Sequence, residues 1–391
     1  MVAPRGDGRT PLDIWSALRE ADPQFWAQFW EPRKEAVVFP NPVPLNELRR
    51  HPAGTDPNEL IKDRFLCRGG SCMLVGPTGV GKSSFTMQLA IQFAQGLEFF
   101  GLRPAGELKT LIVQAENDDG DMAEMRDGVI AGLGIPPEQA ERVLPSVMVL
   151  TEASRTREQF ATLLQAVCAE TKFDLVIVDP LLAYLGGDAS SQRDVSPFLR
   201  NMLNPVLQEH GLGLILVHHT AKPMRSKDKA DWLAGDFAYL GAGSAEFGNW
   251  ARGVLCLESL GDNSVFKLRA GKRGKRLRWV DQHQCYTDEQ YIAHHREPGV
   301  ICWRSPTPTE LESVGVVAAD PVQEVVDAIH AGNLTKADVS RELEKDFDIK
   351  KSTAHRWIDR AVAAHAVRNG KKLTLTGKVK PRDPAETTED E

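Results

Sequence analysis

The sequence predicts an α/β protein with a parallel sheet in its core, followed by a small helical unit that ends in a β-hairpin. Between residues 67 and 303, short apolar runs bounded by polar residues alternate with stretches of helical periodicity. That alternation is typical of parallel strands joined by helices. A glycine-rich loop joins the first of these strands to the first helix. Three helical periods and an Asn-Gly turn lie between residues 321 and 377.

Composition restricts the class of protein. The chain has 391 residues, 42% of them hydrophobic and 26% charged, which is usual for a soluble globular protein of two or three domains. No apolar run approaches the roughly 18 residues of a membrane span, and no leader pattern begins the chain, so we expect a cytoplasmic protein without a membrane partner. The six cysteines are scattered along the sequence, which fits reduced thiols. With a net charge of −7, any nucleic-acid binding must come from local basic patches.

Changes in composition divide the chain. Residues 1–66 carry apolar residues at helical spacing and are expected to form a helical arm or cap, on this chain or on a neighbour. Residues 67–303 form the expected α/β core, and the Pro- and Thr-containing residues 304–320 are expected to be a linker. Residues 321–377 form the small helical unit. The acidic residues 378–391 are expected to be a disordered tail.

Within the core, strands and helices are expected in alternation. The apolar runs predict strands within residues 71–75, 108–118, 146–151, 173–180, 211–220, 251–260, 264–270 and 275–282. The helical periods lie at residues 82–95, 121–132, 157–170 and 194–210.

The loop after the first strand matches the phosphate-binding pattern G-x-x-x-x-G-K-[ST]. Its glycines allow backbone N–H groups to approach phosphate oxygens, and the following helix adds a partial positive charge. Lys82 is expected to reach the β- and γ-phosphates, and the Ser83 hydroxyl to bind Mg²⁺, so ATP and Mg²⁺ are the expected ligands. The residues assigned to nucleotide binding are Gly76, Pro77, Thr78, Gly79, Val80, Gly81, Lys82, Ser83 and Ser84.

Further polar residues follow the ends of other strands. Asp179 ends an apolar strand, where a carboxylate can position Mg²⁺. Glu116 closes a strand that we expect beside the phosphate-loop strand, where it can orient and deprotonate the attacking water; the alternative is a solvated strand-end acid. His218 and His219 end a later strand, from which a histidine can hydrogen-bond phosphate or Glu116.

A metal site is a weaker alternative elsewhere in the core. Cys285, His294, His295 and Cys302 carry ligand atoms, but an ordinary strand and loop is the favoured interpretation.

Four motifs resemble, in order, those of RecA-type ATPases of the plasmid RepA helicase group, which is related to the DnaB-like replicative helicases. These motifs are GPTGVGKS, AEND, LVIVDP and LILVHHTAK, and the resemblance covers about residues 65–280. It implies a RecA-like P-loop NTPase fold. It also implies that Glu116 is the catalytic glutamate, Asp179 the magnesium aspartate and His219 the phosphate sensor.

The resemblance further implies a homo-oligomer, typically a hexameric ring with ATP between subunits and an arginine acting from the neighbour. Arg252, in GNWARGVLCLE, matches the arginine position of RepA-like proteins and is favoured. Arg269, with Lys267, resembles the K-x-R-x-G hairpin of DnaB-like proteins. A plain surface charge remains open for each. The chain lacks an evident N-terminal collar domain and has extra segments at both ends, which departs from both groups.

Two basic stretches in the core are candidates for binding single-stranded DNA. Residues 267–278 contain seven basic residues and no acid, and residues 222–229 form a basic loop. Phosphate-backbone contact is favoured over a solvated charged face. The residues assigned are Lys222, Arg225, Lys227, Lys272, Arg273 and Lys275.

The C-terminal unit resembles a winged helix-turn-helix. Residues 349–372 carry seven basic residues against one acid, and residues 350–360 would be the recognition helix, with Trp357 and Ile358 in its core. Duplex DNA is the expected partner, and a protein-docking module is the alternative. The residues assigned to DNA are Lys350, Lys351, Arg356, Arg360 and Lys371.

Together these features predict an ATP-hydrolysing DNA motor, a helicase-like ATPase of plasmid or phage replication. Two alternatives stay open: an ATP-switched DNA-binding regulator that does not unwind, and a recombinase- or KaiC-like ATPase that acts on protein partners.

Overall fold

The structure is a computed structural model of the 391-residue chain. It describes residues 42–52, 54–220, 239, 241, 243–260, 265–281, 286–314, 320–332, 335–347 and 351–381. The chain divides into two units after His51, and the described part of the first unit holds one 3-10 turn, η1 (Leu45–Glu47). The helical arm expected near residues 14–30 lies outside the described residues. No helix in the described ranges is long and apolar enough to span a membrane.

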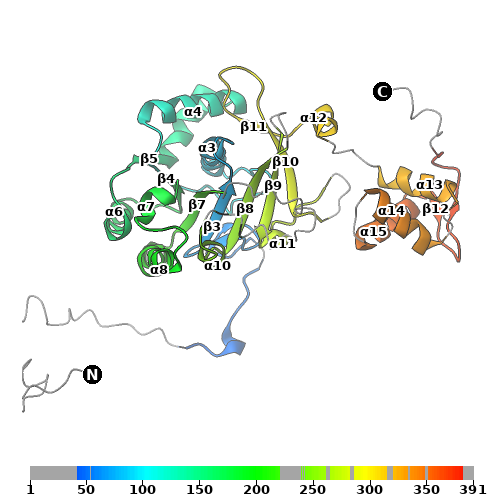
Figure 1. The fold of residues 1–391 in the computed structure, drawn as a ribbon, viewed down its shortest axis with the longest axis horizontal. Coiled ribbons are helices and arrows are strands. Elements are labelled where there is room, and N and C mark those ends of the chain that lie inside the picture. The colour runs from blue at the N-terminus through cyan, green and yellow to red at the C-terminus, as the bar shows by residue number, and fades with distance from the viewer. Residues whose placement is uncertain are drawn as a thin grey trace, which may run out of the picture. The chain divides into compact units, whose positions relative to one another are not determined.

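A nine-stranded sheet forms the core, in the order β11-β10-β9-β8-β3-β7-β6-β4-β5 (Figure 1). Six neighbouring strands run parallel. These are β3 (Ser71–Gly76), β4 (Thr110–Gln114), β5 (Val147–Thr151), β6 (Leu175–Asp179), β7 (Gly213–His219) and β8 (Gly253–Ser259). The parallel sheet is therefore as predicted from the apolar runs.

The sheet continues past β8 with antiparallel strands. These are β9 (Val265–Lys272), β10 (Glu289–His294) and β11 (Trp303–Arg304). The connections from β8 to β9 and from β10 to β11 are too short for a parallel crossover, which needs about a dozen residues or more. The predicted parallel sheet therefore describes the six strands from β5 to β8, and the sheet is antiparallel beyond them.

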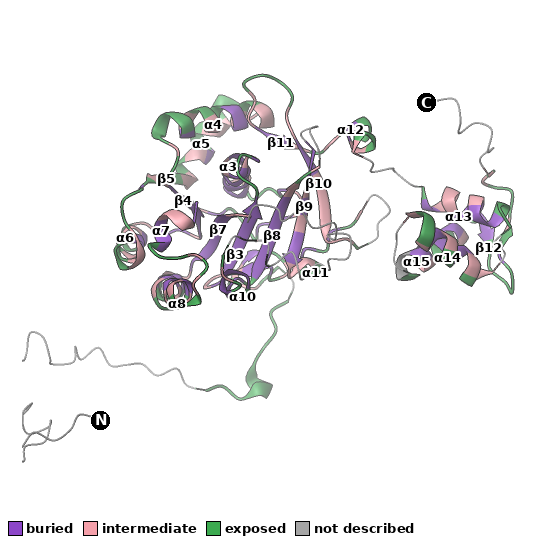
Figure 2. Ribbon diagram, in the orientation of Figure 1, coloured by how far each residue is buried: buried purple, intermediate pink, exposed green. Residues whose placement is uncertain are grey.

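Helices cover both faces of the sheet. Side chains alternate along the strands, so that Leu74 of β3 joins one hydrophobic cluster and Met73 and Val75 join the other. Buried residues fill the central strands (Figure 2). The first face carries α3 (Lys82–Phe93), α4 (Asp119–Leu133) and α5 (Pro137–Val143). The second carries α6 (Arg157–Glu170), α7 (Leu182–Leu185), α8 (Gln192–Pro197), the π-helical η3 (Phe198–Leu203), α9 (Asn204–His210) and α10 (Glu246–Trp250).

The core begins earlier than residue 67. A hairpin of β1 (Glu59–Ile61) and β2 (Leu66–Cys67) precedes β3. Leu60, Ile61 and Phe65 are at most 2% exposed and belong to the first cluster. The predicted boundary missed this hairpin because its strands are too short to show an alternating pattern.

The described residues 275–281 do not form the strand predicted for residues 275–282. The segment contains a short helix, α11 (Gly274–Leu277), between Arg273 and Arg278, which both have positive φ angles (61° and 54°). Arg273 Nη1 donates to the carbonyl of Arg64 (2.9 Å), and Arg276 Nη1 donates to that of Asp63 (3.0 Å). These contacts bring the side chains of Arg273 and Arg276 to the same turn, at residues 63 and 64. In a strand, residues three positions apart point to opposite faces, so these two side chains could not both reach it.

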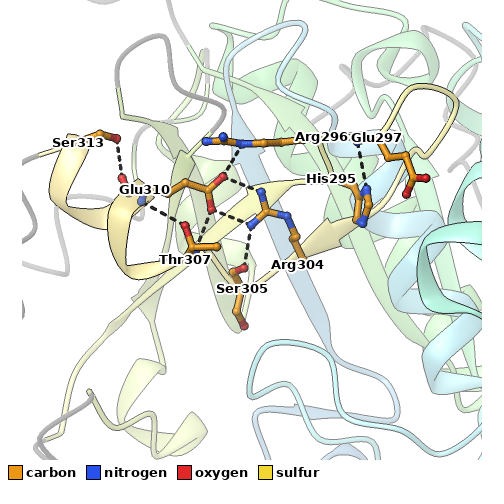
Figure 3. A network of polar contacts seen from close by, with 8 residues as sticks. All are labelled: His295, Arg296, Glu297, Arg304, Ser305, Thr307, Glu310 and Ser313. Carbon is orange, nitrogen blue, oxygen red and sulfur yellow. Dashed lines mark hydrogen bonds and ion pairs between the residues drawn. The ribbon is translucent and has the colours of Figure 1, made fainter.

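The expected linker contains an anchored helix, α12 (Pro308–Ser313). Thr307 and Glu310 form a capping box, in which Thr307 N donates to Glu310 Oε2 (2.7 Å). The same carboxylate accepts from both terminal nitrogens of Arg304 (2.6 and 2.7 Å) and from Arg296 (2.7 Å), as Figure 3 shows. Hydrogen bonds from Arg304 hold the pKa of Glu310 far below its usual range. The Thr-x-x-Glu spacing was a readable capping signal.

The C-terminal unit contains the helices and hairpin predicted for it. The helices are α13 (Pro321–His330), α14 (Lys336–Phe347) and α15 (Lys351–Ala363), and β12 (Val367–Arg368) pairs antiparallel with β13 (Thr374–Leu375). They enclose a hydrophobic cluster of their own, in which Trp357 and Ile358 are buried as predicted.

Candidate phosphate site at the carboxyl edge of the sheet

Four parallel strands bring the predicted site residues to one edge of the sheet. In the order β3-β7-β6-β4, Gly76 lies opposite His219, and Gln114 lies opposite Asp179. Because parallel strands end at a common edge, the phosphate loop, Glu116, Asp179 and His219 meet there. The expectation that the strand of Glu116 lies beside the phosphate-loop strand is wrong, since β7 and β6 separate β4 from β3.

The phosphate loop turns on two glycines with left-handed backbone angles. Gly79 has φ 79°, and Gly81, the N-cap of α3, has φ 84°. Residues other than glycine are strained at such positive φ angles. Gly76 is restricted by space instead, because a Cβ there would lie 3.0 Å from the carbonyl oxygen of Leu257.

Lys82 is buried, 5% exposed, and folds back on its own loop. Its Nζ donates to the carbonyls of Gly76 (3.0 Å) and Pro77 (2.6 Å) and lies 3.2 Å from Nδ1 of His219. Burial lowers the pKa of Lys82, and the charges of Asp179 and Glu116 oppose that shift. The ammonium is thus held where a phosphate oxygen can replace a loop carbonyl as its acceptor.

Asp179 provides an oxygen that fits a divalent cation. The residue is 5% exposed, and burial raises its pKa against a hydrogen bond from the Ser83 hydroxyl and the charge of Lys82. Its Oδ2 atom has no hydrogen-bond partner in the described part of the chain. A buried oxygen without a partner is rare in folded proteins. Together with the Ser83 hydroxyl it forms a pair of hard oxygen ligands, which suits Mg²⁺.

Gln114, which the sequence analysis did not single out, shapes the turn that carries Glu116. Its Oε1 accepts from the backbone N–H groups of Ala115 (2.9 Å) and Glu116 (3.0 Å). Its side chain also hydrogen-bonds Asp179. The charge of Glu116 affects the pKa values of Lys82, Asp179 and His219, so its carboxylate lies near all three. A glutamine that ends an apolar strand was the available signal for this role.

The two adjacent histidines face different surroundings. Nδ1 of His219 lies 3.3 Å from Oγ1 of Thr78, and burial followed by the charge of Lys82 lowers its pKa. His218 is fully buried, with its ring 4.8 Å from that of Phe247. A Cβ on Gly241 would lie 2.6 Å from Cδ2 of the His218 ring. His219 therefore contacts the phosphate loop, whereas His218 packs in the interior.

The side chain of Ser84 is used inside the protein. Its hydroxyl donates to the Gly81 carbonyl (2.8 Å) and accepts from Nε1 of Trp303 (3.1 Å), and the residue is 7% exposed. The hydrogen atom and one acceptor site of the Ser84 hydroxyl therefore already have partners, and the assignment of Ser84 to nucleotide binding stays a prediction.

Arg252 lies at the opposite end of the sheet from the phosphate loop. Its backbone N–H donates to the carbonyl of Ser71, the first residue of β3 (2.9 Å), and its side chain is exposed. The six-residue strand from there to Gly76 spans roughly 17 Å at about 3.3 Å per residue. Arg252 is thus far from its own phosphate loop.

Lys267 and Arg269 are ion-paired within the chain. Nζ of Lys267 lies 2.8 Å from Oε2 of Glu289, and Nη1 of Arg269 lies 2.5 Å from Oε1 of the same residue. Glu258 lies 3.8 Å from Nε of Arg269. The two cations therefore already have carboxylate partners in this structure.

Of the basic residues assigned to single-stranded DNA, only Lys272, Arg273 and Lys275 are among the residues that the structure describes. Lys222, Arg225 and Lys227 lie outside the described residues, in a segment that leaves β7 at the carboxyl edge. Lys272 is the last residue of β9, and residues 273–278 follow it at the opposite end of the parallel strands, where Lys272 pairs with Val254 near the start of β8. There, Lys272 Nζ donates to the carbonyls of Gly248, Asn249 and Ala251 at 2.6–3.2 Å, so all three of its protons have acceptors. Lys272 is therefore not a free phosphate contact, and Arg273 also has carbonyl partners, whereas Lys275 is exposed.

The C-terminal unit presents most of its assigned cations to solvent. Lys351, Arg356, Arg360 and Lys371 are exposed, whereas Lys350 lies outside the described residues. On the same helix, Asp359 pairs with Lys336 of α14 (2.7 Å).

The alternative metal site receives no support. Within the described ranges, no group of three or more His, Cys, Asp and Glu side chains is placed to hold a metal ion. His294 stacks edge-on against Trp303, with ring centroids 4.1 Å apart, and Cys302 Sγ lies 3.5 Å from Gln88 Oε1. Cys285 is outside the described residues.

Comparison with known proteins supports the phosphate site. Residues 40–225 match the family described as AAA domain, a range that contains the phosphate loop, Glu116, Asp179 and His219. A crystal structure of the RadB recombinase aligns with a TM-score of 0.40 and 14% identity over 59% of this chain and 89% of that chain, a likeness too low to carry an argument. The chain has no match among the curated proteins. The family match and the loop geometry together support a P-loop ATPase domain.

Proposed function

We propose that this chain is an ATP-hydrolysing DNA motor, a RecA-like ATPase of the RepA helicase type that acts in plasmid or phage replication. One observation carries the ATPase part of the proposal. Lys82, Ser83, Glu116, Asp179 and His219, from separate segments, converge at one edge of the sheet.

Each residue has a role in hydrolysis that its contacts suit. The loop N–H groups and Lys82 bind the phosphates, after Lys82 exchanges the carbonyls of Gly76 and Pro77 for phosphate oxygens. Ser83 and Asp179 would hold Mg²⁺, which supplies charge neutralisation of the phosphates. Glu116 orients and deprotonates the attacking water.

His219 reports the state of the γ-phosphate. Its Nδ1 already contacts Thr78 and Lys82, two residues of the phosphate loop. The segment that carries Lys222, Arg225 and Lys227 begins two residues after His219. A change in the hydrogen bonds of His219 can thus be passed to a segment that we assign to single-stranded DNA.

A neighbouring subunit completes the site. Arg252 is exposed and far from its own phosphate loop, so it is the better candidate for an arginine that acts in trans. Lys267 and Arg269 would first have to leave Glu289. An arginine in this role requires a homo-oligomer, and the proposed assembly is a hexameric ring.

The C-terminal unit recruits the motor to duplex DNA as a winged helix. The support is the exposed cations of α15 and the hairpin, Lys351, Arg356, Arg360 and Lys371, around a separate hydrophobic core. Full-length protein and residues 1–320 can be compared for duplex binding across a salt series. Loss of the unit should weaken binding and flatten the log–log slope by about 0.9 for each phosphate contact removed. Equal affinities and slopes would favour a protein-docking module.

Strand displacement on a forked duplex tests the complete proposal. Wild-type protein with ATP and Mg²⁺ should release the labelled strand, and single-stranded DNA should stimulate hydrolysis. The Glu116→Gln variant should bind the fork but release no strand. ATP-dependent binding without displacement would instead identify a DNA-binding regulator. Hydrolysis that is indifferent to DNA would favour an ATPase that acts on protein partners.

A further inference from the structure

Two aromatic residues of the antiparallel strands, His294 of β10 and Trp303 of β11, pack against the phosphate loop and are called its floor below. Trp303, the first residue of β11, is 2% exposed, and its indole Nε1 donates to Ser84 Oγ (3.1 Å). The Ser84 hydroxyl in turn donates to the Gly81 carbonyl (2.8 Å). Two consecutive hydrogen bonds thus connect a strand more than 200 residues away in sequence to the last glycine of the loop.

The position of Trp303 is fixed by α3 itself. The buried amide of Gln88 accepts from the backbone N–H of Trp303 (2.7 Å) and donates to its carbonyl (2.9 Å). This pair of bonds resembles the pairing of a neighbouring strand. The next residue, Arg304, is held by both carboxylate oxygens of Glu310 (Figure 3). The indole therefore has little freedom to move away from Ser84.

Gly81 packs directly against both residues of the floor. A Cβ at Gly81 would lie 3.0 Å from Nε2 of His294 and 3.1 Å from Cζ2 of Trp303. His294 also hydrogen-bonds the backbone of Val80. The segment from Val80 to Ser84, whose N–H groups begin α3, is thus supported from below by two aromatic side chains.

We propose that Trp303 is a positioning residue for the phosphate loop, acting through Ser84 to hold the Gly81–Ser84 turn with its N–H groups directed at the phosphates. This inference rests on the proposed ATP binding, but the restraint on the loop is present without nucleotide. A loop that is held in its binding geometry loses less conformational entropy when the ligand binds.

Trp303→Phe removes the indole donor and keeps an aromatic ring in the floor. Trp279→Phe is the matched control, because Trp279 is also buried, at 3% exposure, while its Nε1 has no hydrogen-bond partner among the described residues. One hydrogen bond contributes about 0.5–1.5 kcal/mol. Binding of a fluorescent ATP analogue by the full-length protein should therefore weaken roughly 2- to 13-fold in Trp303→Phe, with kcat changed much less, and should not change in Trp279→Phe.

A double-mutant cycle with Ser84→Ala tests the route through the serine. If Trp303 acts through Ser84, adding Trp303→Phe to Ser84→Ala should cause little further loss of affinity. Additive losses, unchanged binding in Trp303→Phe, or an equal loss in Trp279→Phe would each overturn the proposal.

Amide hydrogen exchange of unliganded protein separates this inference from the proposed function. Peptides that cover residues 76–84 should exchange faster in Trp303→Phe than in wild type or Trp279→Phe. Faster exchange in a protein that binds no ATP would refute the proposed function and retain the restraint on the loop. Unchanged exchange together with normal ATP binding would refute the restraint alone.

Discussion

Lys82 Nζ and His219 Nδ1 lie 3.2 Å apart, so the phosphate loop and the end of β7 contact each other directly. Burial is the first cause that lowers the pKa of His219, and the charge of Lys82 is the second. A neutral imidazole can accept a hydrogen bond from the ammonium. The protonation of the histidine is thus coupled to the position of the lysine.

Lys82→Ala should abolish ATP binding while the fold persists, because it removes the charge placed to reach the β- and γ-phosphates. It should also raise the pKa of His219, since a neighbouring cation is lost. Nucleotide titration and an NMR pH titration of the histidine ring measure the two effects. Lys172→Ala, at an exposed position outside the site, is the control. Normal ATP turnover by folded Lys82→Ala protein would contradict the phosphate-loop assignment.

Glu116→Gln should retain ATP binding and slow hydrolysis by about 10²- to 10⁴-fold, the usual contribution of a general base. Steady-state phosphate release and analogue binding are the measurements. Asp118→Asn is the control, because Asp118 accepts from Asp121 N (2.9 Å) as the N-cap of α4, and asparagine also caps helices well. If Asp118→Asn fails to hydrolyse ATP while Glu116→Gln is normal, the wrong acid has been assigned.

That the predicted site residues meet at one edge could be expected from the sequence, because residues at strand ends need only a parallel sheet to come together. Glu116, Asp179 and His219 each follow an apolar run, and parallel strands end at one edge. The strand order was not predictable, because pairing joins strands that are distant in the sequence. No residue near β4 indicates that β7 pairs with β3. For the same reason the role of Trp303 was missed, because its contact with Ser84 depends on antiparallel strands at the far edge.

Arg252→Ala should lower kcat and leave nucleotide affinity nearly unchanged, because this arginine is proposed to act on the transition state from a neighbour. Mixing it with Lys82→Ala protein should restore some hydrolysis at mixed interfaces. Arg269→Ala serves as the comparison. Because Arg269 pairs with Glu258 and Glu289 of its own chain, its removal should lower stability and should not affect complementation between subunits. Full activity of Arg252→Ala would move the trans role to Arg269.

Glu310→Gln should lower stability at pH 7 by about 2 kcal/mol, since it weakens charge-assisted hydrogen bonds from Arg304. The folded-state pKa of Glu310 is depressed, so its contribution is fully present above the usual glutamate pKa of about 4.3 and is lost as the pH falls toward the folded value. Thermal melts at pH 7 and pH 4 should therefore show a smaller difference between variant and wild type at the lower pH. Glu312→Gln, at an exposed position on the same helix, should match wild type at both. A pH-independent difference would contradict the ionic role of Glu310.

The turn at residues 63–65 decides where the protein can be cut for expression. Asp63 pairs with Arg103 (2.6 Å) and Arg278 (2.7 Å), and the carbonyls of the same turn accept from Arg273 and Arg276. A fragment that starts at residue 67 would lose this turn together with several fully buried side chains, and it would remove the partners that the turn provides to four arginines. A fragment that starts at Pro52, where the second unit begins, keeps the turn and its partners together.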